Sequence, residues 1–174
     1  MGLLEVILDE KAFIPMVTAA VETYPAETIG VLIGFRDTGR IMVQYAVAYQ
    51  TAKRSRNSVE VHPRISRRMD NFLQKVTRLE VVGDFHSHPE DPVDKLSSVR
   101  LSEPDKRSMQ VGNLGIVIAI DKDEVKRPWK HLPKGSLKGC VSPYSLKIVS
   151  YWKAEPKVYK VTKIHCPFAL GLGL

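Results

Sequence analysis

An apolar run that leads into two histidines constrains this chain more than any other feature. Residues 81–89 read Val-Val-Gly-Asp-Phe-His-Ser-His-Pro, which predicts a strand. Side chains alternate between the faces of a strand, so His86 and His88 should point to one side and Ser87 to the other. Pro89 lacks an amide donor and should end the pairing. Two adjacent imidazoles predict half of a zinc site, provided that a third ligand lies nearby.

The rest of the chain alternates between strand and helix patterns. Asp9 should cap the first helix. Helices are expected over residues 10–23, 63–79 and 103–110, and strands over residues 3–8, 27–35, 41–49, 59–61, 81–88, 114–121, 144–153 and 158–165. The fold class predicted from this order is α/β, with a mixed β-sheet and flanking helices.

A length of 174 residues fits one domain with a substantial core, which we place at residues 1–166. Residues 122–143 should form a long basic connection, and connections of this length tend to be functional or mobile. Residues 167–174 carry no regular pattern and should form a loosely held tail.

Composition narrows the function classes. No stretch of about eighteen apolar residues could span a membrane, so we expect a cytoplasmic protein. Cys140 and Cys166 do not form a Cys-x-x-Cys pair, which excludes a zinc ribbon. The net charge of +7 is compatible with nucleic acid, an acidic partner protein or a solvated surface. The basic residues are not interleaved with aromatic side chains, so we do not expect a nucleic-acid partner.

Two acidic residues could complete a hydrolytic zinc site. Asp105 stands at a predicted helix start, three positions after the expected cap Ser102, and could be the third ligand. It could equally be an acid that only suits the helix dipole. Glu27 lies where the first helix gives way to a glycine-containing strand. It could act as a general base, or it could be a solvated turn residue.

These residues together resemble a known family. Glu27-Thr28-Ile29-Gly30-Val31-Leu32-Ile33-Gly34, then His86-Ser87-His88-Pro89, then Ser102-x-x-Asp105 are similar to the JAMM motif of MPN-domain zinc isopeptidases. The resemblance covers about residues 3–165 and implies the MPN fold, which is cytidine-deaminase-like. The loop at residues 90–101 is longer than is usual in that family, which leaves Asp91 and Asp94 as competing ligands.

The resemblance implies a role for each motif residue. His86, His88 and Asp105 would hold one Zn²⁺ per chain, with water in the fourth position. Glu27 would take a proton from that water and deliver it to the leaving amine, and Ser102 would donate a hydrogen bond to the oxyanion. The hydroxyl of Ser102 could instead be fully occupied as the helix cap.

The resemblance also implies a class of substrate. Family members commonly cleave after the C-terminal tail of ubiquitin or a ubiquitin-like protein, and a small single-domain form suggests a prokaryotic or archaeal source. The expected partner is a conjugate of a ubiquitin-like protein, or a sulfur-carrier protein with a C-terminal adduct. The loop 90–101 and the segment 122–143 would wall the channel for that tail. The alternatives are a non-catalytic MPN scaffold for protein interactions and a nucleic-acid-associated member of the family.

Overall fold

The computed structural model describes residues 4–76, 78–91, 93 and 96–172. The helices are α1 (Glu10–Thr23), α2 (Pro63–Val76), α3 (Glu103–Ser108) and α4 (Pro167–Gly171). The strands are β1 (Glu5–Leu8), β2 (Ile29–Asp37), β3 (Arg40–Ala48), β4 (Lys53–Arg54), β5 (Val59–Glu60), β6 (Glu80–Pro89), β7 (Leu114–Lys122), β8 (Lys130–His131), β9 (Leu137–Val141), β10 (Tyr144–Glu155) and β11 (Val158–His165).

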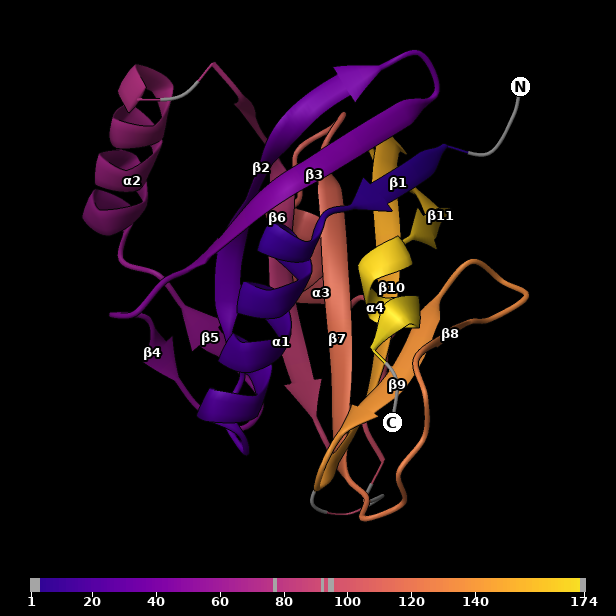
Figure 1. The fold of residues 1–174 in the computed structure, drawn as a ribbon. Coiled ribbons are helices and arrows are strands. Elements are labelled where there is room, and N and C mark those ends of the chain that lie inside the picture. Colours follow the sequence, from indigo (N-terminus) through magenta and orange to yellow (C-terminus); the bar gives the residue numbers. More distant parts are fainter. Residues whose placement is uncertain (1–3, 77, 92, 94–95, 173–174) are drawn as a thin grey trace.

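The large sheet has the strand order β11-β1-β3-β2-β6-β7-β10-β9-β8 (Figure 1). Because β11 pairs with both β1 and β10, seven of these strands close into a barrel-like ring, and β9 and β8 extend from the side of β10. Strand β6 runs parallel to β7, and β1 runs parallel to both of its neighbours, whereas the other pairs are antiparallel. This is the predicted mixed sheet with flanking helices.

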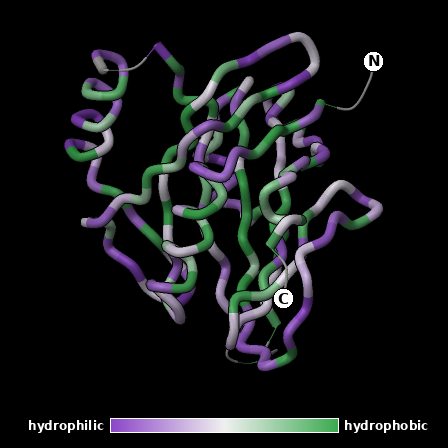
Figure 2. The backbone as a smooth tube through the Cα atoms, viewed as in Figure 1, coloured by the Kyte–Doolittle hydropathy of each residue, from purple (hydrophilic) through white to green (hydrophobic). Residues whose placement is uncertain are grey.

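One face of the central strands packs against α1 and is called the α1 face. Phe85, Ile116, Ile118 and Ile148 are fully buried there, and Figure 2 shows hydrophobic residues concentrated along these strands. Burying one such side chain stabilises the fold by about 1.5–3 kcal/mol. Helix α1 starts where the cap was predicted, because a side-chain oxygen of Asp9 accepts a hydrogen bond from the Lys11 amide at 3.0 Å.

The opposite face, called the α3 face, carries two smaller apolar clusters. Leu73 of α2 packs with Val31 and Ile33 of β2. Leu101 and Met109, which flank α3, pack with Val117 of β7. Helices α2 and α3 thus sit over different strands of this face, and the end of β6 lies between them.

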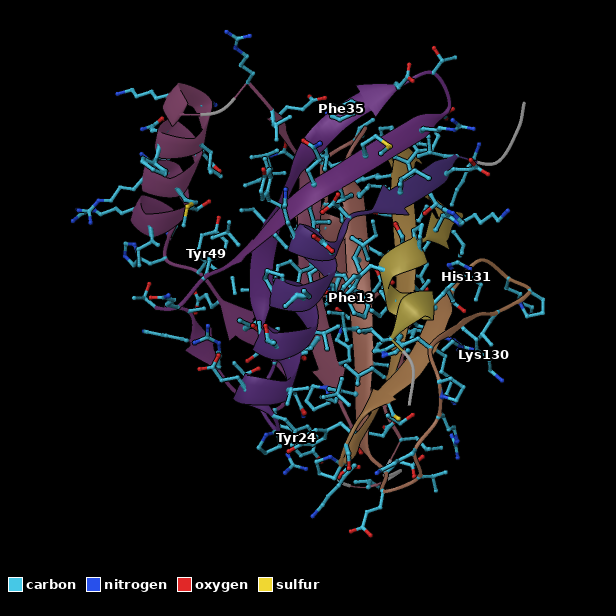
Figure 3. The ribbon with its side chains drawn as sticks, viewed as in Figure 1. Phe13, Tyr24, Phe35, Tyr49, Lys130 and His131 are labelled. Atoms are coloured by element: carbon cyan, nitrogen blue, oxygen red, sulfur yellow. The ribbon has the colours of Figure 1, made fainter. Side chains whose placement is uncertain are left out.

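Two segments differ from the expectation. The segment 122–143 is not an irregular connection, because it contains β8 and β9, which extend the sheet beside β10. Lysine and glycine are poor strand formers, so the local pattern hid these strands. Where a loosely held tail was expected, residues 167–171 form α4, since Phe168 packs edge-on against Phe13 at a ring-centroid distance of 6.0 Å. Figure 3 labels Phe13 on α1, and residues 173–174 lie outside the described residues.

The boundaries of several other elements shifted slightly; for example, β2 begins at Ile29 rather than at residue 27, and α3 ends at Ser108 rather than at residue 110. Pro89 is the last residue of β6 rather than the first residue beyond it, and it stands opposite Ile120 of β7. At a strand terminus the missing amide removes at most one ladder hydrogen bond. Helix α2 ends at Val76 rather than at residue 79.

Candidate metal centre

The two histidines of β6 point to the same side of the sheet, as their spacing predicts. The ring centroids of His86 and His88 lie 4.8 Å apart, and the ring planes are tilted by 54°. Both project from the α3 face, since Val117, the register partner of His86, belongs to the cluster under α3. His86 is buried and His88 is half-buried, so the pair is partly shielded from solvent.

Asp105 joins the two histidines from the first turn of α3. Its Oδ2 atom lies 3.4 Å from His86 Nε2 and 3.6 Å from His88 Nε2. One ligand atom from each of the three residues falls within 4.8 Å of the others. Of the competing acids, Asp94 lies outside the described residues, and Asp91 accepts a hydrogen bond from the Val93 amide at 2.7 Å and is not part of this cluster.

A capping box holds the Asp105 carboxylate in place. The Ser102 amide donates to Asp105 Oδ2 at 2.7 Å, and the Asp105 amide donates to Ser102 Oγ at 3.2 Å. These two bonds fix the side chain at the start of the helix. The carboxylate is therefore held rigidly at the helix start, in a position beside the two histidines of β6.

The chemistry of the three residues suits a divalent metal ion. His86 Nε2 is buried and has no hydrogen-bond partner among the described residues, so a ring nitrogen is available to a metal. His88 Nδ1 lies 2.8 Å from the Ser98 carbonyl oxygen, which can only accept, so the proton is on Nδ1 and the lone pair is on Nε2. Burial by itself raises the pKa of Asp105, but the two imidazoles and Ser102 lower it to well below the ordinary range. The carboxyl is therefore ionised, as a metal ligand must be.

Glu27 lies beside this cluster. It is half-buried just before β2, and it lines the same pocket as His86 and His88. Burial raises its pKa to about 6, Asp105 adds to the rise, and the two histidines oppose it. A carboxyl group with a pKa near neutrality can both accept and return a proton, which is what a general acid/base does.

Ser87 has a structural role that the motif alone does not reveal. It is fully buried on the face opposite the histidines, where its Oγ accepts a hydrogen bond from the Thr28 amide at 2.9 Å. The Ser87 amide in turn donates to the Thr28 carbonyl at 3.0 Å. These two bonds tie the residue next to Glu27 to the residue between the two histidines.

The cluster opens into a pocket of about 460 Å³ on the α3 face. Its walls come from β2, β6, α2 and α3, and from the segment around β5. No described residue of the loop 90–101 or the segment 122–143 lines this pocket. The loop does reach the metal cluster, because the Ser98 carbonyl oxygen lies 2.8 Å from His88 Nδ1.

Asp84 is a pocket residue that the sequence analysis missed. Burial raises its pKa to about 6, Asp105 adds to the rise, and His86 opposes it. Alternation along β6 could have found it, since residues 84, 86 and 88 share one face.

The family of the chain follows from its sequence together with this arrangement. Residues 9–132 match the family described as prokaryotic homologs of the JAB domain. The chain belongs to this prokaryotic JAB family. The matched range contains Glu27, both histidines and Asp105.

A solved structure agrees in fold. The solution structure of protein DSY2949 from Desulfitobacterium hafniense superposes with a TM-score of 0.64 and covers 92% of each chain at 20% identity. No curated protein matches the sequence. Within the described residues, none of the helices has the length and apolar character needed to cross a bilayer.

Proposed function

We propose that this prokaryotic JAB chain is a zinc-dependent peptidase. It would hydrolyse the bond that follows the C-terminal tail of a ubiquitin-like modifier or a sulfur-carrier protein, an isopeptide bond to lysine being the typical case. The observation that carries this proposal is the convergence of His86, His88 and Asp105, with Glu27 in the same pocket.

His86 and His88 would hold the metal through their Nε2 atoms, and Asp105 would hold it through a carboxylate oxygen, a donor set that zinc accepts. Bound zinc supplies a Lewis acid that polarises the scissile carbonyl and makes water more acidic. Three protein ligands would leave one coordination position for water, as in catalytic rather than structural zinc sites.

Glu27 moves the proton. Its carboxylate takes a proton from the attacking water as the new C–O bond forms, and it returns that proton to the amine nitrogen as the C–N bond breaks. Its raised pKa suits both steps better than the pKa of a solvated glutamate. Because Glu27 is not among the clustered ligand atoms, it remains free for this task.

Ser102 can serve as cap and as donor at the same time. As the cap of α3, its Oγ accepts from the Asp105 amide and so uses a lone pair. Its hydroxyl group also lowers the pKa of the Asp105 carboxyl, as a donor to that carboxylate does, and the side chain is exposed where it lines the pocket. The hydroxyl can therefore donate to an oxyanion, a contact worth about 3 kcal/mol in comparable sites.

The shape of the pocket favours an extended substrate. A second hollow of about 560 Å³ shares Asp70, Val81, Gln110 and Asn113 with the first, so a groove continues from the metal centre along α2. A flexible tail that ends in small residues could occupy such a groove in a strand-like conformation.

The proposal is tested by incubating the purified protein with an isopeptide-linked ubiquitin-like conjugate, with and without a chelator. Wild type should contain about one zinc per chain and lose turnover on chelation. Glu27→Gln should keep its zinc and lose activity by about 10²- to 10⁴-fold. Glu22→Gln, at an exposed position on α1, should behave as wild type. Protein that never met a chelator and still holds no zinc would support a non-catalytic scaffold instead.

A further inference from the structure

Three lysines stand directly opposite one another on three adjacent strands. Lys147 of β10 pairs in register with Lys138 of β9, and Lys138 pairs with Lys130 of β8. Register partners project from the same face of a sheet, so these residues form one row, called the lysine row. Lys130 lies on β8, on the opposite side of the view from α2 (Figure 3).

The lysine row lies in register with His88 of the metal centre. Lys147 also pairs with Ala119 of β7, and Ala119 pairs with His88 of β6. The lysines therefore project from the same face as His88. With neighbouring strands about 4.8 Å apart, Lys147, Lys138 and Lys130 lie about 10, 14 and 19 Å from the His88 position along this row.

The row is not paired with any acidic side chain in the described part of the chain. Among the described residues, no carboxylate oxygen lies within 4.0 Å of any of the three ammonium groups. Like charges directly opposite each other destabilise a sheet. Lys138 and Lys147 are half-buried, so solvent screens them less than it would screen fully exposed side chains. Three positive charges in one row without a described acidic partner are typical of a site that binds an anionic group of another molecule.

A hollow next to the row adds a fourth cation. It has a volume of about 280 Å³ and is lined by Arg127, Pro128, Lys130, Lys138 and Gly139. Arg127 is held there through its backbone, because its amide donates to Cys140 Sγ at 2.8 Å and the thiol donates back to the Arg127 carbonyl at 3.0 Å. The Arg127 guanidinium also lies 3.4 Å from Asp123, whereas no described carboxylate lies within 4.0 Å of the lysines that face the hollow.

We propose that the lysine row and Arg127 bind acidic side chains of the protein substrate. This inference rests on the proposed function. An extended chain advances about 3.3 Å per residue, so the row is reached about three to six residues from the scissile bond. The tail that enters the groove along α2 lies on one side of the scissile bond. Because the row lies on the other side of β6, the acidic residues should lie in the substrate on the opposite side of that bond.

The row fits a carboxylate-bearing peptide better than a nucleic acid. It spans two strand spacings, about 10 Å, whereas proteins that bind duplex DNA commonly contact about six to ten phosphates. The row contains no aromatic side chain on which a base could stack.

The test compares Lys138→Gln with Lys160→Gln, which removes one exposed lysine from β11. A fluorescent twelve-residue peptide with four glutamates, and its glutamine counterpart, are titrated against each zinc-loaded protein by anisotropy. We expect binding of the glutamate peptide only, weakened about two- to fivefold by Lys138→Gln, about tenfold or more by replacing all three lysines, and unchanged by Lys160→Gln.

Three outcomes would overturn the proposal: no binding of the glutamate peptide, equal losses in the two single variants, or tighter binding of a twelve-nucleotide single-stranded RNA through the same lysines. A second arm measures KM for conjugates with glutamates three to six residues from the scissile bond, on either side. The KM should be lower only for conjugates with glutamates on one side of the scissile bond, and this difference should vanish in Lys138→Gln. If no conjugate is cleaved at all, the proposed peptidase activity fails, while the binding arm still decides the lysine site.

Discussion

Replacing Lys138 by glutamine should make the protein more stable. Lys138 faces Lys147 on one side and Lys130 on the other, so its ammonium group takes part in two directly opposed like-charge pairs. Each such pair costs about 0.2–1 kcal/mol. Removing the central charge relieves both, which predicts a gain of about 0.4–2 kcal/mol, whereas Lys130→Gln and Lys147→Gln each relieve one pair and should gain about half as much.

The measurement is thermal unfolding followed by circular dichroism, repeated as urea titrations. For a chain of this length, 1 kcal/mol corresponds to about 2–4 °C in Tm. Adding Lys130→Gln to Lys138→Gln should give no further gain, because no pair remains for it to relieve. High salt should shrink all these differences, since the Debye length falls to about 3 Å at 1 M.

The ranking of the variants decides between register and net charge. If the three single variants and the control Lys160→Gln gain the same amount, the effect is one of overall charge, and the reasoning from register is refuted. A loss of stability in Lys138→Gln would refute it more directly. Increased stability together with weaker binding of acidic peptides would indicate that the row is kept for its ligand at a cost to the fold.

Three further predictions concern other parts of the molecule. Ser87→Ala leaves the buried Thr28 amide without its side-chain acceptor, so the free energy of unfolding should fall by about 1–3 kcal/mol. Turnover should fall as well, because Glu27 is next to Thr28 and would be held less firmly; an unchanged Tm would contradict this. Gly34→Ala places a methyl group 1.7 Å from the Met42 carbonyl oxygen and should cost about 3 kcal/mol or more, whereas Gly171→Ala, with nothing within 4 Å, should leave Tm unchanged. Burial, then His165 and Lys163, lower the pKa of His131 below its ordinary 6.5. The unfolded chain therefore binds this proton at a higher pH than the folded protein does, and stability should fall as the pH drops below about 6.5. In His131→Gln the urea midpoint should decrease less steeply with falling pH than in wild type, and an identical pH dependence would argue against this reasoning.

Much of the site could be predicted from local patterns. The period of two along residues 81–88 places His86 and His88 on one face without any knowledge of the sheet. The Ser102-x-x-Asp105 spacing predicts a capping box, and the structure contains both of its hydrogen bonds. Asp84 follows from the same period of two and could have been included.

Local patterns could not predict which segments form the walls of the pocket. Loop length pointed to the segments 90–101 and 122–143, but in the second segment β9 pairs with the edge of β10 and β8 pairs with β9. Length carries no information about which strand edge is free to pair, and that depends on residues distant in sequence.

The sequence alone therefore determined the elements, the caps and the shared face of the two histidines, because each depends on interactions within a few residues. Only the tertiary structure decided that Asp105 reaches them, that Ser87 ties Glu27 to the same strand, and that three lysines line up with His88. Those outcomes depend on the order and register of strands, which are set by the packing of the whole sheet rather than by any segment of it.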